Sequence, residues 1–170
     1  MAAAAWEAGI AVTPYNLGVR RETSEQVVAR LEAEAAPRLV AEEPCRLVLS
    51  FGANDATVED GRVRVAPEHS VAALREALRI AGRLGAPAFV VGPPPVAEPA
   101  HAERIAGLSA RLAAACTVPY VEVASALRAS GPWMAEARAG DGAHPAAAGY
   151  GQLAGIVRAP FLRWLRSDNV

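Results

Sequence analysis

Lysine is absent from this sequence, and its 17 basic residues are all arginines. With 18 acidic residues against them, the formal net charge at pH 7 is −1. A chain this close to neutral has no overall field that attracts nucleic acid or an anionic membrane. Without lysine it also lacks the phosphate-binding loop that ends in Gly-Lys-Ser/Thr, and it has no Gly-x-Gly-x-x-Gly dinucleotide motif. We therefore expect no nucleic-acid partner and no cofactor.

Cysteine is scarce as well. Cys45 and Cys116 each lie in an apolar stretch, which favours buried thiols in a reducing compartment, although a single bridge between them stays open. No His, Cys or carboxylate spacing indicates a metal site. No apolar run approaches the roughly 20 residues of a membrane span, and the start of the chain has no signal-peptide pattern. We expect a soluble, cytoplasmic protein that does not bind membranes.

The length of 170 residues predicts one domain that spans residues 1–170, because a typical domain has about 100–200 residues. Alanine is abundant, with 40 residues in the chain and five among the first eight. Because alanine is the strongest helix former, Met1–Ala8 is predicted to be a helix that ends at Gly9. No capping residue and no strand precede this helix in the sequence.

Apolar patterns predict strands that alternate with helices. Thr23 and Gln26 have the spacing of a capping box at the start of a helix. The predicted strands are 10–17, 46–51, 88–91 and 119–123. The predicted helices are 23–37, 67–85, 105–115 and 145–165, with Pro160 expected to kink or divide the last one. Such alternation, with strands that are apolar on both faces, is typical of a parallel sheet covered by helices on each side.

Three polar motifs stand where functional residues lie in parallel sheets, at the carboxyl ends of strands and before the last helix. They are Gly18 within 15–24, Gly52-Ala53-Asn54-Asp55, and Asp141-Gly142-Ala143-His144-Pro145. Each taken singly also fits an ordinary turn or a helix cap.

Together, and in this order, the motifs resemble the later sequence blocks of the SGNH, or GDSL-type, acylhydrolase family. The resemblance implies a three-layer α/β/α, flavodoxin-like fold and the hydrolysis of small-molecule esters by serine-hydrolase chemistry. It implies that His144 is the general base and that Asp141 orients it. The oxyanion hole would be formed by the backbone N–H of Gly18 and the side-chain amide of Asn54.

The Gly-Asp-Ser block that carries the nucleophile in this family is not found in the sequence. No serine stands in that context; Ser24, Ser50, Ser70, Ser109, Ser125, Ser130 and Ser167 all lie elsewhere. The helix at Met1–Ala8 occupies the place that follows this block in the family. We therefore expect a sheet that lacks its first strand, which would lie between the strands ending at Gly18 and Gly52. An open sheet edge would favour a homo-oligomer.

Three hypotheses follow. The protein is an ester hydrolase whose reading frame continues upstream of Met1, or it is a catalytically inactive relative that acts as a binding or scaffold module. The third hypothesis is an active variant with another nucleophile, for which Ser50 is the candidate.

Other polar and aromatic residues receive less specific predictions. His69 and His101 are expected to face solvent. Arg20 and Arg21 are expected to pair with carboxylates such as Glu22 or Glu25, with a place at the pocket mouth as the alternative. Trp133 is either a pocket wall or a buried anchor.

Overall fold

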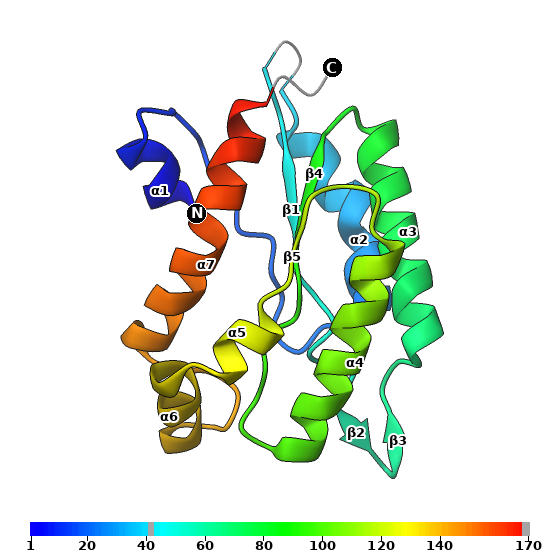
Figure 1. Cartoon of the computed structure of the whole chain (residues 1–170). Helices are drawn as coiled ribbons and strands as arrows, with labels where there is room; N and C mark the ends of the chain where they lie inside the picture. Colours follow the sequence, from blue (N-terminus) through cyan, green and yellow to red (C-terminus); the bar gives the residue numbers. More distant parts are fainter. Residues whose placement is uncertain (41–42, 168–170) are drawn as a thin grey trace.

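The computed structural model describes residues 1–40 and 43–167. Within them a parallel sheet with the strand order β1-β4-β5 runs through the middle of the molecule (Figure 1). Its strands are β1 (Leu47–Leu49), β4 (Ala88–Val91) and β5 (Tyr120–Val121). A hairpin of β2 (Val58–Glu59) and β3 (Arg62–Val63) lies apart from this sheet. The predicted α/β class with a parallel sheet is confirmed.

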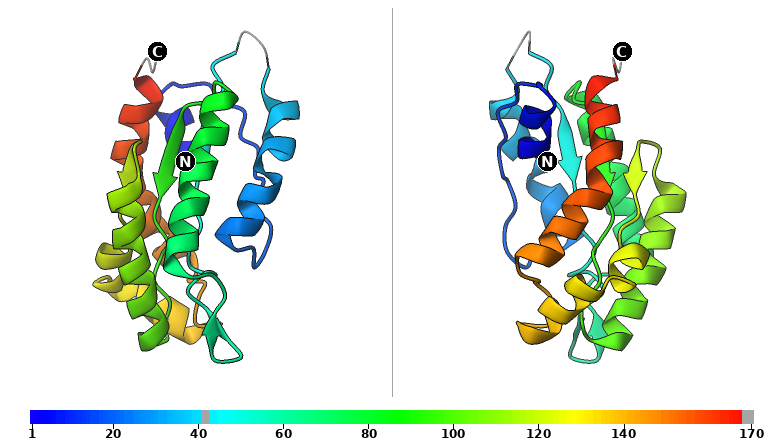
Figure 2. Two further views of the ribbon diagram at one scale, coloured as in Figure 1. Left: turned by 90° about the vertical axis from the view of Figure 1, so that its right-hand side faces the viewer. Right: turned by 60° about the vertical axis from the view of Figure 1, so that its left-hand side comes forward.

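Helices cover both faces of the sheet (Figure 2). The side chains of β4 alternate, so that Ala88 and Val90 join one apolar cluster while Phe89 and Val91 join the other. The cluster around Val90 includes residues of α2 (Ser24–Ala35), α3 (Pro67–Arg83) and α4 (Pro99–Ala115). The cluster around Phe89 includes residues of α1 (Ala2–Glu7), α5 (Ala124–Arg128), α6 (Gly131–Ala139) and α7 (Ala147–Arg166). The sheet is therefore the middle of three layers.

Local sequence signals mark several helix ends correctly. At the start of α2, the Thr23 hydroxyl accepts the N–H of Gln26, and the Gln26 side chain accepts the N–H of Thr23 at 2.9 Å. Helix α3 begins at Pro67, and Gly85 follows its end in the left-handed conformation, with φ of 63°. Gly9, with φ of 74°, follows α1 in the same way.

The segment 10–17 is not a strand, which corrects the prediction. A strand needs hydrogen bonds to a neighbour about 4.8 Å away, and within the described residues β1 pairs with β4 alone. Pro14 also lacks an N–H for such pairing. The segment runs as irregular chain on the β1 side of the sheet (Figure 2). Strand β1 is thus the edge of the described sheet. Its Val48 is 38% exposed, so the predicted cover on both faces does not hold there.

Short elements and one proline also depart from the sequence pattern. The β2–β3 hairpin, α5 and α6 were not expected, because elements this short show little periodicity in their apolar residues. Helix α7 is not divided at Pro160. Val157 and Phe161 lie on either side of this proline and are buried in the core, and their packing offsets the lost hydrogen bond.

The cysteines are less buried than predicted. Cys45 and Cys116 are both free thiols of intermediate exposure, so no bridge joins them. Burial nevertheless raises the pKa of the Cys116 thiol. In the ranges 1–40 and 43–167, no helix is both long and apolar enough to cross a bilayer.

Candidate active site

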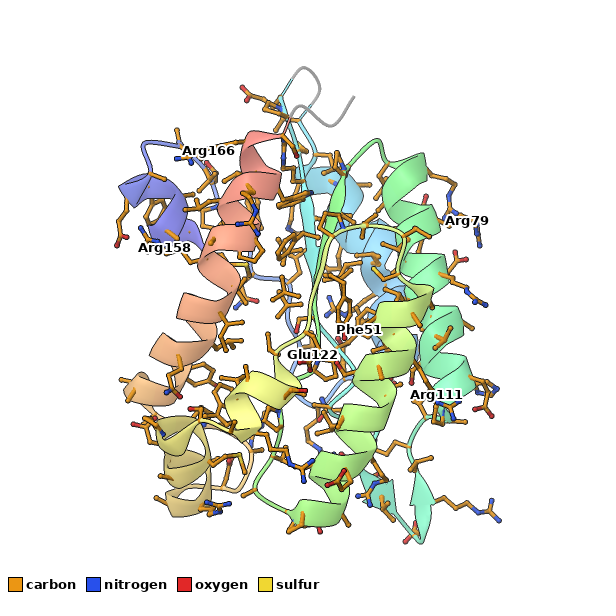
Figure 3. The ribbon with its side chains drawn as sticks, in the orientation of Figure 1. Phe51, Arg79, Arg111, Glu122, Arg158 and Arg166 are labelled. Atoms are coloured by element: carbon orange, nitrogen blue, oxygen red, sulfur yellow. The ribbon has the colours of Figure 1, made fainter. Side chains whose placement is uncertain are left out.

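The candidate site lies in the loops beyond the carboxyl ends of the parallel strands. Figure 3 shows Phe51, which follows β1 by two residues, and Glu122, which follows β5, at a similar level beyond their strands. In open parallel sheets this is the end at which ligands bind. The motif 52–55 lies in the loop after β1, and the motif 141–144 lies in the loop before α7.

Asp55 ties the loop after β1 to two helices. Its side chain is fully buried, and Oδ1 accepts the backbone N–H of Ser24, at the start of α2, at 2.8 Å. Oδ2 accepts the hydroxyl of Ser70 in α3 at 2.6 Å. Donors such as these are required to compensate a buried carboxylate for the loss of water. Asp55 therefore has a structural role, and it fixes the backbone next to Asn54.

Asn54 donates from Nδ2 to the carbonyl oxygen of Glu22 at 2.9 Å. An amide NH2 has two protons, so this bond orients the group and leaves the second N–H for a ligand. The N–H of Gly18, the other predicted oxyanion donor, is bonded to Oδ1 of Asn16 at 3.0 Å. The described contacts place Glu22, rather than Gly18, against Asn54. An oxyanion would reach the Gly18 N–H only after the exposed Asn16 side chain turns away.

Asp141 and His144 are brought together by a tight turn. Oδ2 of Asp141 lies 2.7 Å from Nδ1 of His144, while Oδ1 accepts the backbone N–H groups of Ala143 and His144 at 2.9 and 2.8 Å. These donors hold the pKa of Asp141 well below its usual range. Gly142 makes the turn possible, because its φ of 84° is strained for any other residue.

The ring of His144 has one free nitrogen. Asp141 occupies Nδ1, and no described residue hydrogen-bonds to Nε2. The His144 side chain is 64% exposed, so Nε2 is open to a substrate or an attacking hydroxyl. This is the arrangement that a general base requires.

Glu136 fixes the start of α7, directly after this turn. Its carboxylate accepts the N–H groups of Gly149 at 2.6 Å and Ala148 at 3.3 Å. It thereby satisfies donors at a helix end whose N-cap residue provides no side-chain bond. Gly149 packs so closely that a Cβ there would lie 2.5 Å from Cβ of Pro145. No sequence pattern indicated Glu136, which lies 13 residues from its partner.

The two predicted motifs meet at one small apolar cluster. Ala53, beside Asn54, and Ala143, beside His144, both pack against it. The cluster consists of Ala56, Val96, Ile105 and Ala124. The structure therefore brings the loops of Asn54 and His144 into one neighbourhood.

Helix α4 supports the Asn54 loop with two side chains that sequence reasoning missed. The ring nitrogen Nε2 of His101 lies 2.9 Å from the carbonyl oxygen of Ala53, and Nε of Arg104 donates to the carbonyl oxygen of Ala56 at 2.8 Å. The prediction that His101 faces solvent is wrong, because the ring is partly buried against this loop. No local pattern marks a contact across 48 residues.

Other predictions are resolved by direct contacts. His69 is exposed, as expected. Arg21 pairs with Glu59 of the hairpin at 3.1 Å, rather than with a carboxylate next to it in sequence. Trp133 is a buried anchor, 1% exposed, and its indole N–H donates to the carbonyl oxygen of Pro95 at 3.0 Å.

No serine of the described residues hydrogen-bonds to His144. Three serine side chains are buried away from solvent: Ser24, Ser70 and Ser109. Ser50, the alternative nucleophile, is exposed at the end of β1, and no hydrogen bond links it to His144.

Comparisons with known proteins identify the fold and the family of the chain. The chain resembles the crystal structure of a lipase/acylhydrolase from Enterococcus faecalis, with a TM-score of 0.56 and 24% identity, over 81% of this chain and 69% of that one. It also resembles a GDSL-like lipase from Bacteroides thetaiotaomicron, with a TM-score of 0.67 and 18% identity, over 96% of this chain and 78% of that one. No curated protein sequence matches the chain significantly. The sequence model of the GDSL-like lipase/acylhydrolase family matches residues 2–152, and the chain belongs to this family.

Proposed function

We propose that the chain contributes the proton-transfer and oxyanion-binding groups of a site that hydrolyses small-molecule carboxylic esters. The observation that carries the proposal is the 2.7 Å contact between Oδ2 of Asp141 and Nδ1 of His144, on a ring whose Nε2 is free and exposed. Membership of the GDSL-like lipase/acylhydrolase family supports the same chemistry.

In the proposed reaction, Nε2 of His144 accepts the proton of an attacking hydroxyl as its oxygen bonds to the ester carbonyl carbon. Asp141 takes no proton; it keeps Nδ1 protonated and stabilises the imidazolium that forms. The free N–H of Asn54 donates to the developing oxyanion, and the N–H of Gly18 does so once the side chain of Asn16 has turned away. Loss of one such donor typically raises the barrier by about 3–4 kcal/mol. The imidazolium then protonates the leaving alkoxide, and the alcohol departs, which leaves the acyl group on the attacking oxygen. A water molecule that gives a proton to Nε2 of His144 then attacks this acyl group, and the imidazolium returns the proton to the attacking oxygen as the acid is released.

The proposal also places the nucleophile outside these 170 residues. None of their serines stands in a Gly-Asp-Ser context. Loss of the nucleophile from a triad enzyme lowers the rate by a factor on the order of 10⁶. We therefore expect the 170 residues alone to be inactive on esters. If they are active, Ser50→Ala tests the alternative nucleophile, which is eliminated when the variant keeps full activity.

The upstream reading frame and a hydrolysis assay test the proposal. A Gly-Asp-Ser about 15–30 codons before Met1, which leaves room for the end of a strand and a connection, supports it. A stop codon close to Met1 contradicts it. The extended protein should hydrolyse 4-nitrophenyl acetate and should lose this activity when that serine or His144 is replaced by alanine.

His69→Ala is the matched control, because His69 is an exposed histidine with no contact to the candidate site. It should leave hydrolysis unchanged. An extended protein that binds esters but does not hydrolyse them would be a binding module instead.

A further inference from the structure

One side chain on α2, Arg30, holds the loop 17–22 at two points. Its Nη2 donates to the carbonyl oxygen of Leu17 at 2.6 Å. Its Nε and Nη2 donate to the carboxylate of Glu22 at distances between 2.5 and 2.9 Å. The side chains of Arg30 and Glu22 are only 24% and 15% exposed, so water competes weakly for these charged hydrogen bonds.

Each point of attachment is connected to one of the predicted oxyanion donors, either through a shared peptide unit or through a hydrogen bond. The carbonyl of Leu17 and the N–H of Gly18 belong to one planar trans peptide unit, so fixing the C=O also fixes the direction of the N–H. The carbonyl of Glu22 accepts the hydrogen bond that orients the amide of Asn54. A single guanidinium group is therefore linked to both donors.

The backbone between the two points is held in a disfavoured conformation. Arg21 has a φ of 67°, in the left-handed region that residues with a Cβ rarely adopt. It lies within a turn closed by a bond from the N–H of Glu22 to the carbonyl of Val19 at 3.4 Å. Arg64 donates to the carbonyl of Arg21 at 2.9 Å. Such a conformation persists only where surrounding contacts hold it, and Arg30 and Arg64 supply these contacts.

We propose that Arg30 is a positioning residue that sets the orientation of the Gly18 N–H and the Asn54 amide. The inference rests on the proposed function for what these two donors do in the reaction. Arginine is required because its planar group bonds a carboxylate through two nitrogens while a further N–H reaches Leu17. Lysine has one nitrogen and keeps the charge but not this geometry. A role that is only electrostatic would tolerate lysine.

The test uses nuclear magnetic resonance of the full 170-residue chain with the Asn54 side-chain amide and the Gly18 amide assigned. The variants are Arg30→Lys, Arg30→Met and Glu22→Gln. Arg38→Met is the matched control, because Arg38 follows α2, pairs with Glu34 at 3.1 Å and has no contact with the loop. Circular dichroism identifies a temperature at which every compared variant is folded.

We expect all three variants of Arg30 and Glu22 to shift both amide signals. They should also speed the exchange of the Asn54 amide protons with water about tenfold, as for the loss of a partly buried hydrogen bond. Arg38→Met should leave both signals in place. The proposal is overturned if folded Arg30→Lys keeps the signals and exchange rates of the unaltered chain. If Arg30→Met does not fold, Arg30→Lys and Glu22→Gln still decide the outcome.

Acetate, the acid product of a simple ester, separates this inference from the proposed function. Acetate should shift the two amide signals of the unaltered chain in a saturable way and bind more weakly to Arg30→Lys. If acetate does not shift the two amide signals of the unaltered chain, the oxyanion role of these donors is contradicted. The effect of Arg30 on their orientation is judged by the variants alone.

Discussion

One carboxylate sets both the backbone and the ring of the proposed base. Oδ1 of Asp141 accepts the backbone N–H of His144 at 2.8 Å, and Oδ2 lies 2.7 Å from Nδ1 of the same residue. The turn that brings the ring within reach is therefore closed by the group that binds the ring. Because a carboxylate only accepts hydrogen bonds, Nδ1 must carry the proton.

Asp141→Asn should change which nitrogen of neutral His144 carries the proton. The unaltered chain should hold the proton on Nδ1, whereas an amide at position 141 can also donate to that nitrogen and so removes the preference. Nitrogen chemical shifts of the imidazole ring measure the two tautomers. Asp60→Asn, at an exposed hairpin residue, is the control and should change nothing. Equal tautomer populations in the unaltered chain and in Asp141→Asn would contradict the orienting role.

The same contacts predict a dependence of stability on acid. The folded pKa of Asp141 lies below its ordinary value of about 4, so the unfolded state binds the proton first as the pH falls. The contribution of Asp141 is therefore present above about pH 4 and is lost as the pH falls toward the folded pKa. Urea unfolding at a series of pH values should show the difference between the unaltered chain and Asp141→Asn shrinking below pH 4. A difference that stays constant with pH would rule out this linkage.

Contacts between near neighbours in sequence were predictable, whereas contacts between distant segments were not. The capping box of Thr23 and Gln26 and the pairing of Asp141 with His144 each join residues three apart, so a short motif contains both partners. The segment 10–17 has the composition of a strand, but strand pairing needs a neighbour that no local pattern supplies.

The supports of the Asn54 loop lie beyond local patterns for the same reason. Asp55 reaches Ser24 across 31 residues, and His101 reaches Ala53 across 48. Asp55 itself belongs to the predicted motif 52–55, so the sequence indicated this residue but not its distant partner. At His101, a polar position near a helix start indicated solvent exposure, and only the packing of α4 against the loop shows otherwise.

Tyr120 should ionise in strongly alkaline solution. Burial raises the pKa of its phenol to about 12, and its hydroxyl lies 2.9 Å from Oγ of Ser109. An unfolded tyrosine ionises at about pH 10, so as the pH rises the unfolded state loses its proton first. The contribution of Tyr120 to stability is complete below about pH 10 and is lost as the pH approaches about 12.

Ultraviolet absorbance of tyrosinate measures this titration. Tyr120→Phe should remove a step near pH 12, whereas Tyr15→Phe, at a residue that is 59% exposed, should leave that step in place. Loss of the step in Tyr15→Phe, or its survival in Tyr120→Phe, would show that Tyr120 is not the group responsible.

Two glycines of α7 should respond in opposite directions to alanine. A Cβ at Gly149 would lie 2.5 Å from Cβ of Pro145 and 3.0 Å from the carboxylate of Glu136, so the loop that carries His144 must shift. Overpacking of this kind costs about 1–3 kcal/mol. A Cβ at Gly151, two residues further along the same helix, meets nothing within 4 Å, and Gly→Ala in a helix stabilises by up to about 1 kcal/mol. Urea unfolding should therefore show Gly149→Ala less stable and Gly151→Ala more stable than the unaltered chain. Both changes add the same methyl group to one helix. Equal effects on the free energy of unfolding would therefore mean that helix propensity alone sets the stability of both variants. They would also mean that a glycine at position 149 is not needed for the packing of Pro145 next to the proposed base.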